Sequence, residues 1–245
     1  MTTRSLGKTL AVIPARGGSK RIPDKNIKLF YGKPMVGYII DAAQKSGVFD
    51  TIHVSTDSGA IAEIAETLGC KPEFMRSDEL SGDHTPIVAV LRYVVEQYEN
   101  RDVKFDTIAL LYATAALIEP EDLKKAVELF YAGDPNLPVL SITSYPVPIE
   151  WAFHKGDANK LDPINADACA RRSQDLPESF FDAGCFNIYA SEYLKQSIGA
   201  GSYNDYRGFD LPRIKAIDID TPEDWAFAEA VFGASRSAGL TVDDN

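Results

Sequence analysis

The 245-residue sequence predicts an α/β fold, with a mostly parallel sheet covered by helices on both faces. Short apolar runs of strand length alternate along the chain with longer segments whose apolar residues recur at helical spacing. Some of the runs are nearly continuous, which is typical of parallel strands that are buried on both faces. With 45% hydrophobic residues the chain can bury a substantial core, and we expect one domain over residues 1–245.

The first part of the chain contains two strand–helix units. A strand is expected at 9–15 (TLAVIPA), followed by a helix at 35–47 whose terminal glycine is a plausible stop. The β-branched run 51–57 predicts the second strand. Ser58, or the aspartate before it, can then cap a helix at 59–69.

The same alternation continues in the middle of the chain. Residues 86–99 predict a strongly amphipathic helix, and 105–113 form a nearly continuous apolar run that suits a central strand. A helix is expected at 119–133, with acidic residues in its first turn and a glycine at its end. Residues 136–146 predict a further strand.

The pattern changes at about 145–180, a segment with four prolines and little periodicity. We expect an excursion from the sheet there, either a self-contained flap or an arm that packs on a partner. A strand and a helix return at 180–196, and a last strand is expected at 213–220. The run that starts at Thr221 then places a cap, a proline and acidic residues at the start of the final helix.

The net charge of −11 argues against a general nucleic-acid or membrane-surface binder, since such proteins are usually basic. No apolar stretch reaches the roughly 18–20 residues of a membrane span, and the N-terminus does not resemble a signal peptide. The three cysteines are widely spaced, which argues against a disulfide or zinc site and favours a reducing, cytoplasmic location.

The segment LAVIPARGGSKRIPDKN, residues 10–26, places two glycines and four cations directly after the first strand. Ligands of parallel sheets bind at this end of the strands, and glycines let backbone N–H groups approach an anion. We therefore expect a polyphosphate site, although a tight turn with solvated basic residues is the simpler alternative. Its candidate ligands are Ala15, Arg16, Gly17, Gly18, Ser19, Lys20 and Lys25.

Two carboxylates near the C-terminus complement this basic loop. In a strand, Asp218 and Asp220 would lie on the same face, where they repel each other unless a cation sits between them. Oxygen ligands together with phosphates suggest Mg²⁺. The alternative is that one of the two merely caps the following helix.

Seven motifs occur in order over roughly residues 8–230: IPARGGSKRIPDKN, GKPM, VSTD, RSDEL, RRSQDLPE, DAG and IDIDTPED. In this order and spacing they resemble the CMP-sugar synthetases, the cytidylyltransferases that activate sialic acid and related nine-carbon acids. The segments KRIP, SYPVPIEWAF and RRSQDLPESFFDAG look most like the pseudaminic acid branch. This resemblance implies a Rossmann-like fold and a Mg²⁺-dependent reaction in which CTP and the acid form a CMP-sugar and pyrophosphate.

Several site assignments follow from the resemblance alone. Arg16 and Lys20 match phosphate-binding positions, with Lys25 near the leaving pyrophosphate, and Arg76 matches a residue that faces cytosine. Asp218 and Asp220 match the metal-binding pair, and either one is a candidate base for the attacking hydroxyl. A solvated or ion-paired surface residue is the alternative for Arg76.

The sugar acid is assigned to residues in and just after the proline-rich excursion. Arg171 and Arg172 are candidates to bind its carboxylate, and Gln174 and Asp182 to contact its polar substituents. In the resembled family the excursion reaches into the neighbouring subunit of a homodimer. The arginine pair would then complete the partner's site, whereas a solvated pair is the alternative.

The sequence departs from the family in two places. The strand at 105–113 usually leads into PTSP or PTAP, but Ala113 and Ala116 replace both prolines here while Thr114 remains. The stretch after RSDEL usually carries several hydroxyl residues, and here it keeps only Thr85. The second departure concerns the expected contacts to base and ribose and leaves the enzyme class unchanged.

Other functions stay open at this point. Legionaminic acid, N-acetylneuraminic acid or KDO are alternative sugar substrates, since a few hydrogen bonds discriminate between them. A phosphatase or kinase is disfavoured because the Walker motif is missing. A non-catalytic nucleotide-binding regulator is disfavoured because it would not require the acidic pair.

Overall fold

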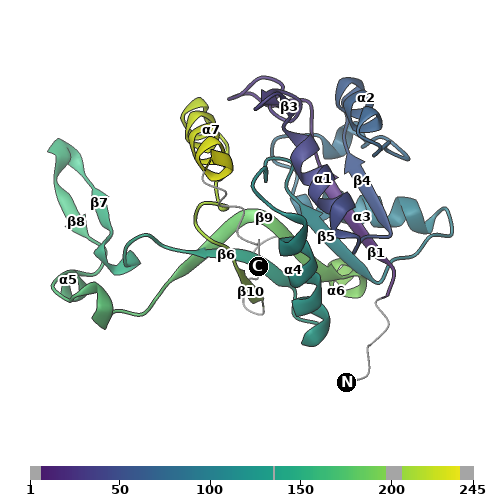
Figure 1. The fold of residues 1–245 in the computed structure, drawn as a ribbon. Helices are drawn as coiled ribbons and strands as arrows, with labels where there is room; N and C mark the ends of the chain where they lie inside the picture. The colour runs from purple at the N-terminus through teal and green to yellow at the C-terminus, as the bar shows by residue number, and fades with distance from the viewer. Residues whose placement is uncertain (1–6, 135, 197–205, 238–245) are drawn as a thin grey trace.

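The computed structural model describes residues 7–134, 136–196 and 206–237. Six strands form one sheet in the order β10-β6-β9-β5-β1-β4. They are β1 (Thr9–Pro14), β4 (Thr51–Ser55), β5 (Thr107–Leu111), β6 (Val139–Ser144), β9 (Phe180–Ala190) and β10 (Arg207–Asp210). All run in one direction except β9, which pairs antiparallel with both β5 and β6. The mostly parallel α/β fold is therefore confirmed (Figure 1).

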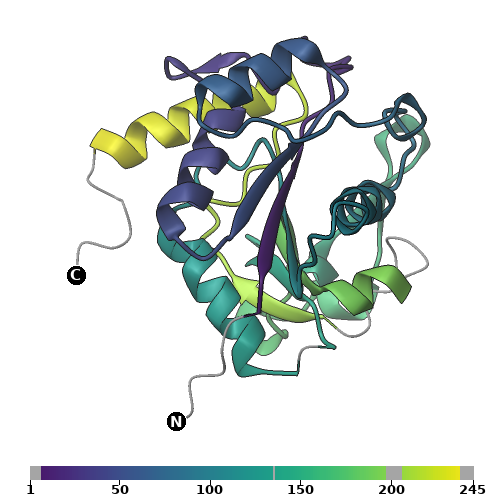
Figure 2. The ribbon, with the colours of Figure 1, turned by 90° about the vertical axis from the view of Figure 1, so that its right-hand side faces the viewer.

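Helices cover both faces of this sheet (Figure 2). One core joins the sheet to α1 (Val36–Ser46), α2 (Gly59–Thr67) and α4 (Pro120–Ala132). The other joins it to α3 (Ile87–Glu99) and α6 (Ser191–Gln196). Strand β1 lies between these layers, and its first five residues are buried because side chains on both of its faces meet apolar helix surfaces.

Local chemistry explains where these helices begin and end. Ser58 Oγ accepts a hydrogen bond from the backbone N–H of Ile61 and starts α2 as expected. Glu119 and Asp122 form a reciprocal capping box at the start of α4. Gly47 ends α1 with a φ of 66°, a left-handed conformation that costs glycine little.

A third core connects the two ends of the chain. It packs Ile22 and Phe30, from the segment after β1, against Ile219 and against Trp225 of α7 (Pro222–Ser237). Phe30 also lies in the short hairpin of β2 (Leu29–Phe30) and β3 (Lys33–Pro34). This packing brings the basic loop after β1 beside the acidic segment that precedes α7.

The strand predicted at 213–220 is wrong. Within the described residues β10 is the last strand, and residues 211–220 leave the sheet after the Leu211 N–H bonds to Ile142 O. Pro212 has no N–H to continue the ladder, and a turn follows in which Lys215 N–H bonds to Pro212 O. Side chains at 218–220 still alternate between solvent and core although this segment pairs with no strand. Ile219 is buried, while the aspartates on either side of it contact solvent.

Residues 145–180 form an arm that projects from the sheet between β6 and β9 (Figure 1). It contains a hairpin of β7 (Phe153–Lys155) and β8 (Leu161–Pro163), followed by α5 (Ala166–Cys169). The departure from the sheet expected for this proline-rich segment is therefore confirmed.

Among the described residues, no helix has the length and apolar character needed to cross a membrane.

Candidate active site

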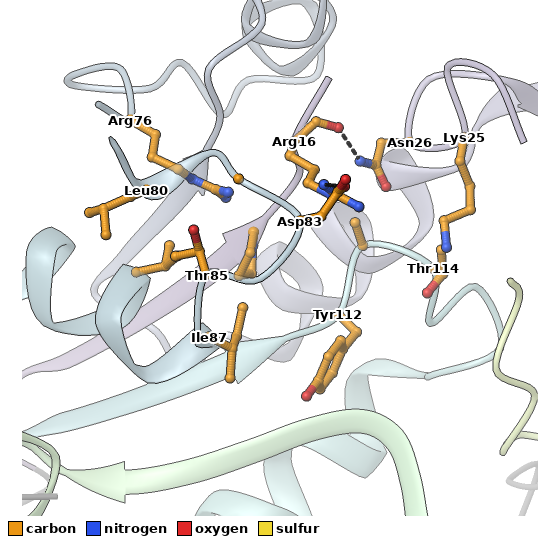
Figure 3. A pocket seen from close by; sticks show the side chains of 14 residues that line it. Arg16, Lys25, Asn26, Arg76, Leu80, Asp83, Thr85, Ile87, Tyr112 and Thr114 are labelled. Carbon is orange, nitrogen blue, oxygen red and sulfur yellow. Dashed lines mark hydrogen bonds and ion pairs between the residues drawn. The ribbon is translucent and has the colours of Figure 1, made fainter. Parts of the chain in front are cut away.

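A cleft of about 230 Å³ lies at the carboxyl ends of β1 and β5 (Figure 3). Four parts of the chain line it: the end of β1 with the loop after it, the segment between α2 and α3, the start of α3, and the turn after β5. An adjoining hollow of about 310 Å³ continues along the basic loop toward Asp220. The two share Arg16, Lys25, Asn26 and Asp83. Together they form one depression with a more apolar end and a strongly charged end.

Hydrogen bonds shape the basic loop from within. Asn26 is 7% exposed, and its Nδ2 donates to Arg16 O over 2.9 Å, which closes the loop on itself. Gly17 passes so close to α2 that a Cβ there would lie 3.0 Å from Ser58 Cβ. Its N–H donates to Asp57 Oδ1 over 2.9 Å and is therefore already used, in contrast to the expectation for this glycine. Ala15 is buried, and its N–H donates to Ser55 O.

The remaining loop residues point their polar groups to the charged hollow. Ser19, Lys20 and Lys25 line it, whereas a Cβ built on Gly18 would meet no atom within 4 Å. Lys20 is largely exposed, and Lys25 is only 17% exposed. The loop therefore presents one largely exposed and one partly buried ammonium group to an anion in the hollow.

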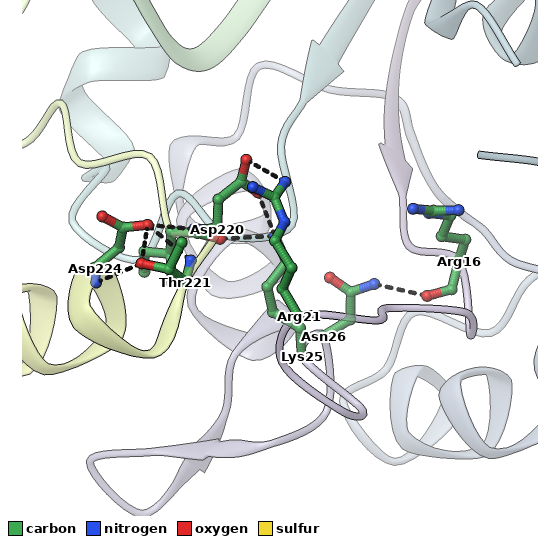
Figure 4. Close-up of polar contacts among 8 residues, drawn as sticks. Arg16, Arg21, Lys25, Asn26, Asp220, Thr221 and Asp224 are labelled. Atoms are coloured by element: carbon green, nitrogen blue, oxygen red, sulfur yellow. Dashed lines mark hydrogen bonds and ion pairs between the residues drawn. The ribbon is translucent and has the colours of Figure 1, made fainter. Parts of the chain in front are cut away.

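Lys25 links the basic loop to the C-terminal carboxylates (Figure 4). Its Nζ donates to Ile219 O over 2.7 Å and to Asp220 Oδ1 over 3.1 Å. Arg21 Nη2 lies 2.7 Å from the other oxygen of Asp220. Burial would raise the pKa of the Asp220 carboxyl, but the hydrogen bond and charge of Lys25, with those of Arg21, hold it below its usual value.

Asp218 lies in a different electrostatic environment. Surrounding protein atoms partly shield its carboxyl from water, and the negative charge of Asp220 acts in the same direction, so its pKa is raised. A cation between the two aspartates would relieve this repulsion. No group of three or more His, Cys, Asp or Glu suited to a metal occurs in the part of the chain that the structure describes. Mg²⁺ commonly needs only one or two protein carboxylates when phosphates supply further oxygens, so this donor set fits.

Arg76 forms a wall at the opposite end of the cleft. It is 7% exposed, its Nη2 donates to Ser55 O over 2.5 Å, and its Nε donates to Ser55 Oγ over 3.1 Å. Burial is the main reason why its pKa is lowered. A guanidinium anchored on one edge in this way has a fixed position, which suits recognition of a planar polar group.

The two candidate hydroxyl residues both line the cleft. Thr85 lies beside Leu80 and Ile87, near Arg76, and Thr114 lies across the cleft in the turn after β5 (Figure 3). Tyr112, at the start of this turn, adds an aromatic ring to the lining. The structure therefore brings together the residues expected for phosphate and base, from segments far apart in sequence.

The residues assigned to the sugar acid are not brought to this cleft within one subunit. Arg171, Arg172 and Gln174 lie on the arm, exposed, and Arg172 pairs with Asp175 at 2.9 Å. Asp182 lies on β9, where it accepts a hydrogen bond from Gly184 N–H over 2.8 Å. Its pKa is raised by burial. None of the four lines either part of the depression.

Sequence reasoning gave no role to Arg21, Asn26 and Asp83, polar residues that line the depression. Arg21 and Asn26 belong to the loop segment that had been singled out, but nothing in the segment shows which polar side chains stabilise the loop. Asp83 follows RSDEL by three residues in SGDHTP. A carboxylate opposite two predicted phosphate ligands is visible only once the chain is folded.

Comparison with known proteins places these residues in a family. A family model described as cytidylyltransferase matches residues 10–145. A pseudaminic acid cytidylyltransferase of Campylobacter jejuni is 36% identical over 234 residues, which are 95% of this chain and all of the relative. A CMP-N,N'-diacetyllegionaminic acid synthase of Legionella pneumophila is 31% identical over 94% of this chain and 99% of the relative.

Solved structures support the fold. A CMP-2-keto-3-deoxy-manno-octonic acid synthetase complexed with CTP superposes with a TM-score of 0.66 and 20% sequence identity, over 93% of this chain and 99% of that one. The family expected from the motifs is therefore confirmed. The chain belongs to the cytidylyltransferase family and is a nucleotidyltransferase that uses CTP.

Proposed function

We propose that the protein transfers a cytidylyl group from CTP to a nine-carbon ulosonic acid, best assigned as pseudaminic acid. The observation that carries this proposal is the single depression that runs from buried Arg76, past Arg16 and Lys25, to Asp220. The similarity to the Campylobacter jejuni enzyme over 95% of the chain favours pseudaminic acid over other acids.

We assign a part of the nucleotide to each end of the depression. Cytosine lies toward Arg76 and Thr85, and the triphosphate follows the basic loop, where Arg16, Lys20 and Lys25 neutralise its charge. The anomeric hydroxyl of the acid attacks the α-phosphorus, its oxygen forms a new P–O bond, and the bond to the bridging oxygen of pyrophosphate breaks. Lys25, fixed by Ile219 O and Asp220, stabilises the charge that develops on the leaving pyrophosphate.

Asp218 and Asp220 would hold Mg²⁺ together with phosphate oxygens of CTP. The ion, when bound, supplies positive charge against the phosphates and orients them. The carboxylate pair also accepts the proton of the attacking hydroxyl. Asp218 suits this role because burial and the charge of Asp220 raise its pKa above the usual value of an aspartate, which makes it the stronger base of the pair.

We further propose that the active form is a homodimer assembled through the arm, residues 145–180. Exposed apolar side chains of the arm include Val147, Ile149, Phe153, Leu161 and Ile164. A run of such side chains on a projecting hairpin is typical of an interaction surface. In such a dimer Arg171 and Arg172, remote from the cleft of their own subunit, bind the carboxylate of the acid in the partner's cleft.

Release of pyrophosphate tests the proposed reaction. Purified protein with CTP and Mg²⁺ is offered pseudaminic, legionaminic and N-acetylneuraminic acids and KDO in separate assays. Release with pseudaminic acid, abolished by EDTA, is expected. Release only with another acid would overturn the substrate assignment, and silence with all four, despite CTP binding, would favour a nucleotide-binding regulator.

A further inference from the structure

The carboxylate of Asp83 holds two cations of the basic loop at once. Its Oδ1 is ion-paired with Arg16 Nη1, and its Oδ2 lies 2.5 Å from Lys20 Nζ. Each carboxylate oxygen therefore has its own cationic partner. The hydrogen bonds from Lys20 and then Arg16 lower the pKa of Asp83 to about 2, so that the group is ionised at neutral pH.

Asp83 lines both parts of the depression. In the cleft its carboxylate lies beside the Arg16 guanidinium (Figure 3). Asp83 belongs to residues 81–86, between the 3₁₀ helix Asp78–Leu80 and α3. Among the described residues, the polar side-chain contacts between this segment and the basic loop are the two ion pairs of Asp83. The carboxylate therefore occupies the path from the base end to the phosphate end.

A carboxylate and a phosphate present similar anionic oxygens to arginine and lysine. Arg16 and Lys20 are also the residues proposed above to bind the triphosphate. The negative charge of Asp83, which lines both parts of the depression, would repel phosphates placed beside it and compete with them for the same two cations. We infer that Asp83 is an internal competitor of polyphosphate, displaced when CTP binds and returning to Arg16 and Lys20 as pyrophosphate leaves.

This competition weakens the binding of every ligand that must take the two cations from Asp83. Displacing Asp83 therefore weakens the binding of CTP and of pyrophosphate, whereas the binding of cytidine, which has no phosphate, is unaffected. For the enzyme the consequence is faster release of pyrophosphate after transfer. The inference rests on the proposed function for the identity of the nucleotide, but the competition itself concerns any polyphosphate.

Calorimetric titration of wild type and Asp83→Asn with pyrophosphate, CTP and cytidine tests the inference. The titrations are done in EDTA, so that no metal contributes, and in about 0.15 M salt, which screens distant charges. The matched control is Glu79→Gln, which removes the same charge from an exposed position close by that does not line the depression.

Asp83→Asn is expected to lower the Kd of pyrophosphate and of CTP by about three- to tenfold, in line with the modest strength of exposed ion pairs. The Kd of cytidine and the titrations of Glu79→Gln stay unchanged. Unchanged or weaker pyrophosphate binding by Asp83→Asn would overturn the inference, because Asp83 would then position Arg16 rather than compete for it.

Steady-state kinetics give a second readout that a merely structural role would not produce. Asp83→Asn is expected to lower the KM for CTP and the inhibition constant of pyrophosphate together, without a gain in kcat. Inhibition by pyrophosphate equal to that of wild type would contradict the competition. Tighter pyrophosphate binding in a protein that fails to bind CTP would support the competition and overturn the proposed cytidylyltransferase reaction.

Discussion

The ammonium nitrogen of Lys215 lies 2.8 Å from Asp122 Oδ2, although the two residues are 93 positions apart in the sequence. The same nitrogen lies 2.6 Å from Glu119 Oε2, so one buried lysine joins both members of the α4 capping box. Burial would lower the pKa of Lys215, but these hydrogen bonds outweigh it and raise the pKa. The lysine anchors the irregular segment that carries Asp218 and Asp220.

Replacing Lys215 by methionine is expected to reduce the free energy of unfolding by about 2–4 kcal/mol, because two partly buried carboxylates lose their counterion. Urea unfolding followed by circular dichroism measures the change. Lys195→Met is the matched control, since this lysine contacts Glu99 and Glu192 at a more exposed position. Equal effects of the two substitutions would contradict the anchoring role.

Removing the charge of Asp220 tests the acidic pair. Asp220→Asn is expected to lower kcat by about 10²-fold or more, because charge placed against the transition state is lost and Lys25 loses its partner. Pyrophosphate release at saturating CTP measures the effect. Glu223→Gln removes an equal charge from the exposed first turn of α7 and is expected to retain activity near that of wild type. Loss of activity in both variants alike would point to a general electrostatic effect.

Arg76 is expected to act on the base rather than on the phosphates. Arg76→Lys keeps the charge but loses the planar fork held by Ser55, so kcat/KM for CTP is expected to fall about tenfold or more. The same assay with UTP measures selectivity, which is expected to decline. An unchanged preference for CTP over UTP in the variant would show that the base is read elsewhere.

We expect the buried His53 to make the folded protein less stable in acid. It is 1% exposed, and burial, with the charges of Arg76 and Arg101, lowers its pKa to about 4. The unfolded chain therefore binds a proton below about pH 6.5 that the folded chain takes up only near pH 4. Stability that is present above pH 6.5 is lost as the pH falls through this window, by about 3 kcal/mol in total.

Urea unfolding at several pH values checks this expectation. The destabilisation caused by His53→Gln, relative to wild type, is expected to shrink between pH 7 and pH 4.5, because the glutamine does not titrate. His154→Gln, at an exposed position on the arm, is expected to leave the pH profile unchanged. A constant difference between wild type and His53→Gln across the window would show that His53 is not the group responsible.

We expect a single charged substitution on the arm to prevent the proposed dimer from forming. Phe153 is 50% exposed on β7, and Phe153→Asp is expected to convert a dimer into a folded monomer in sedimentation velocity experiments. Leu29→Asp places the same charge at an exposed apolar position of β2, outside the arm, and leaves the dimer intact. A monomeric wild type would contradict the proposed assembly.

Hydrophobic pattern predicted most of the fold. The apolar runs at 9–15 and 105–113 became β1 and β5, and capping residues such as Ser58 marked helix starts correctly. The antiparallel direction of β9 was not predicted, because direction depends on how the arm returns to the sheet. Alternation around Ile219 suggested a strand, but the burial of Ile219 in the third core produces the same pattern without strand pairing.

The site was only partly predictable for a related reason. Glycines and cations clustered in 10–26 form a local signal, and the structure places this loop in contact with Asp220 of the expected acidic pair. Asn26 and Asp83 are single polar residues in loops, and their roles depend on partners distant in space. The proposed contact of Arg171 and Arg172 with the sugar acid would come from a partner subunit, and no local pattern in the sequence encodes how two subunits fit together.

The fate of the anomeric oxygen tests the central claim most directly. Pseudaminic acid labelled with ¹⁸O at the anomeric hydroxyl is incubated with CTP, Mg²⁺ and the protein, and the products are followed by ³¹P NMR and mass spectrometry. The label is expected in the phosphodiester of a CMP-sugar, with pyrophosphate free of it. Label in pyrophosphate, or no CMP-sugar although CTP is bound, would contradict attack of the sugar acid on the α-phosphorus.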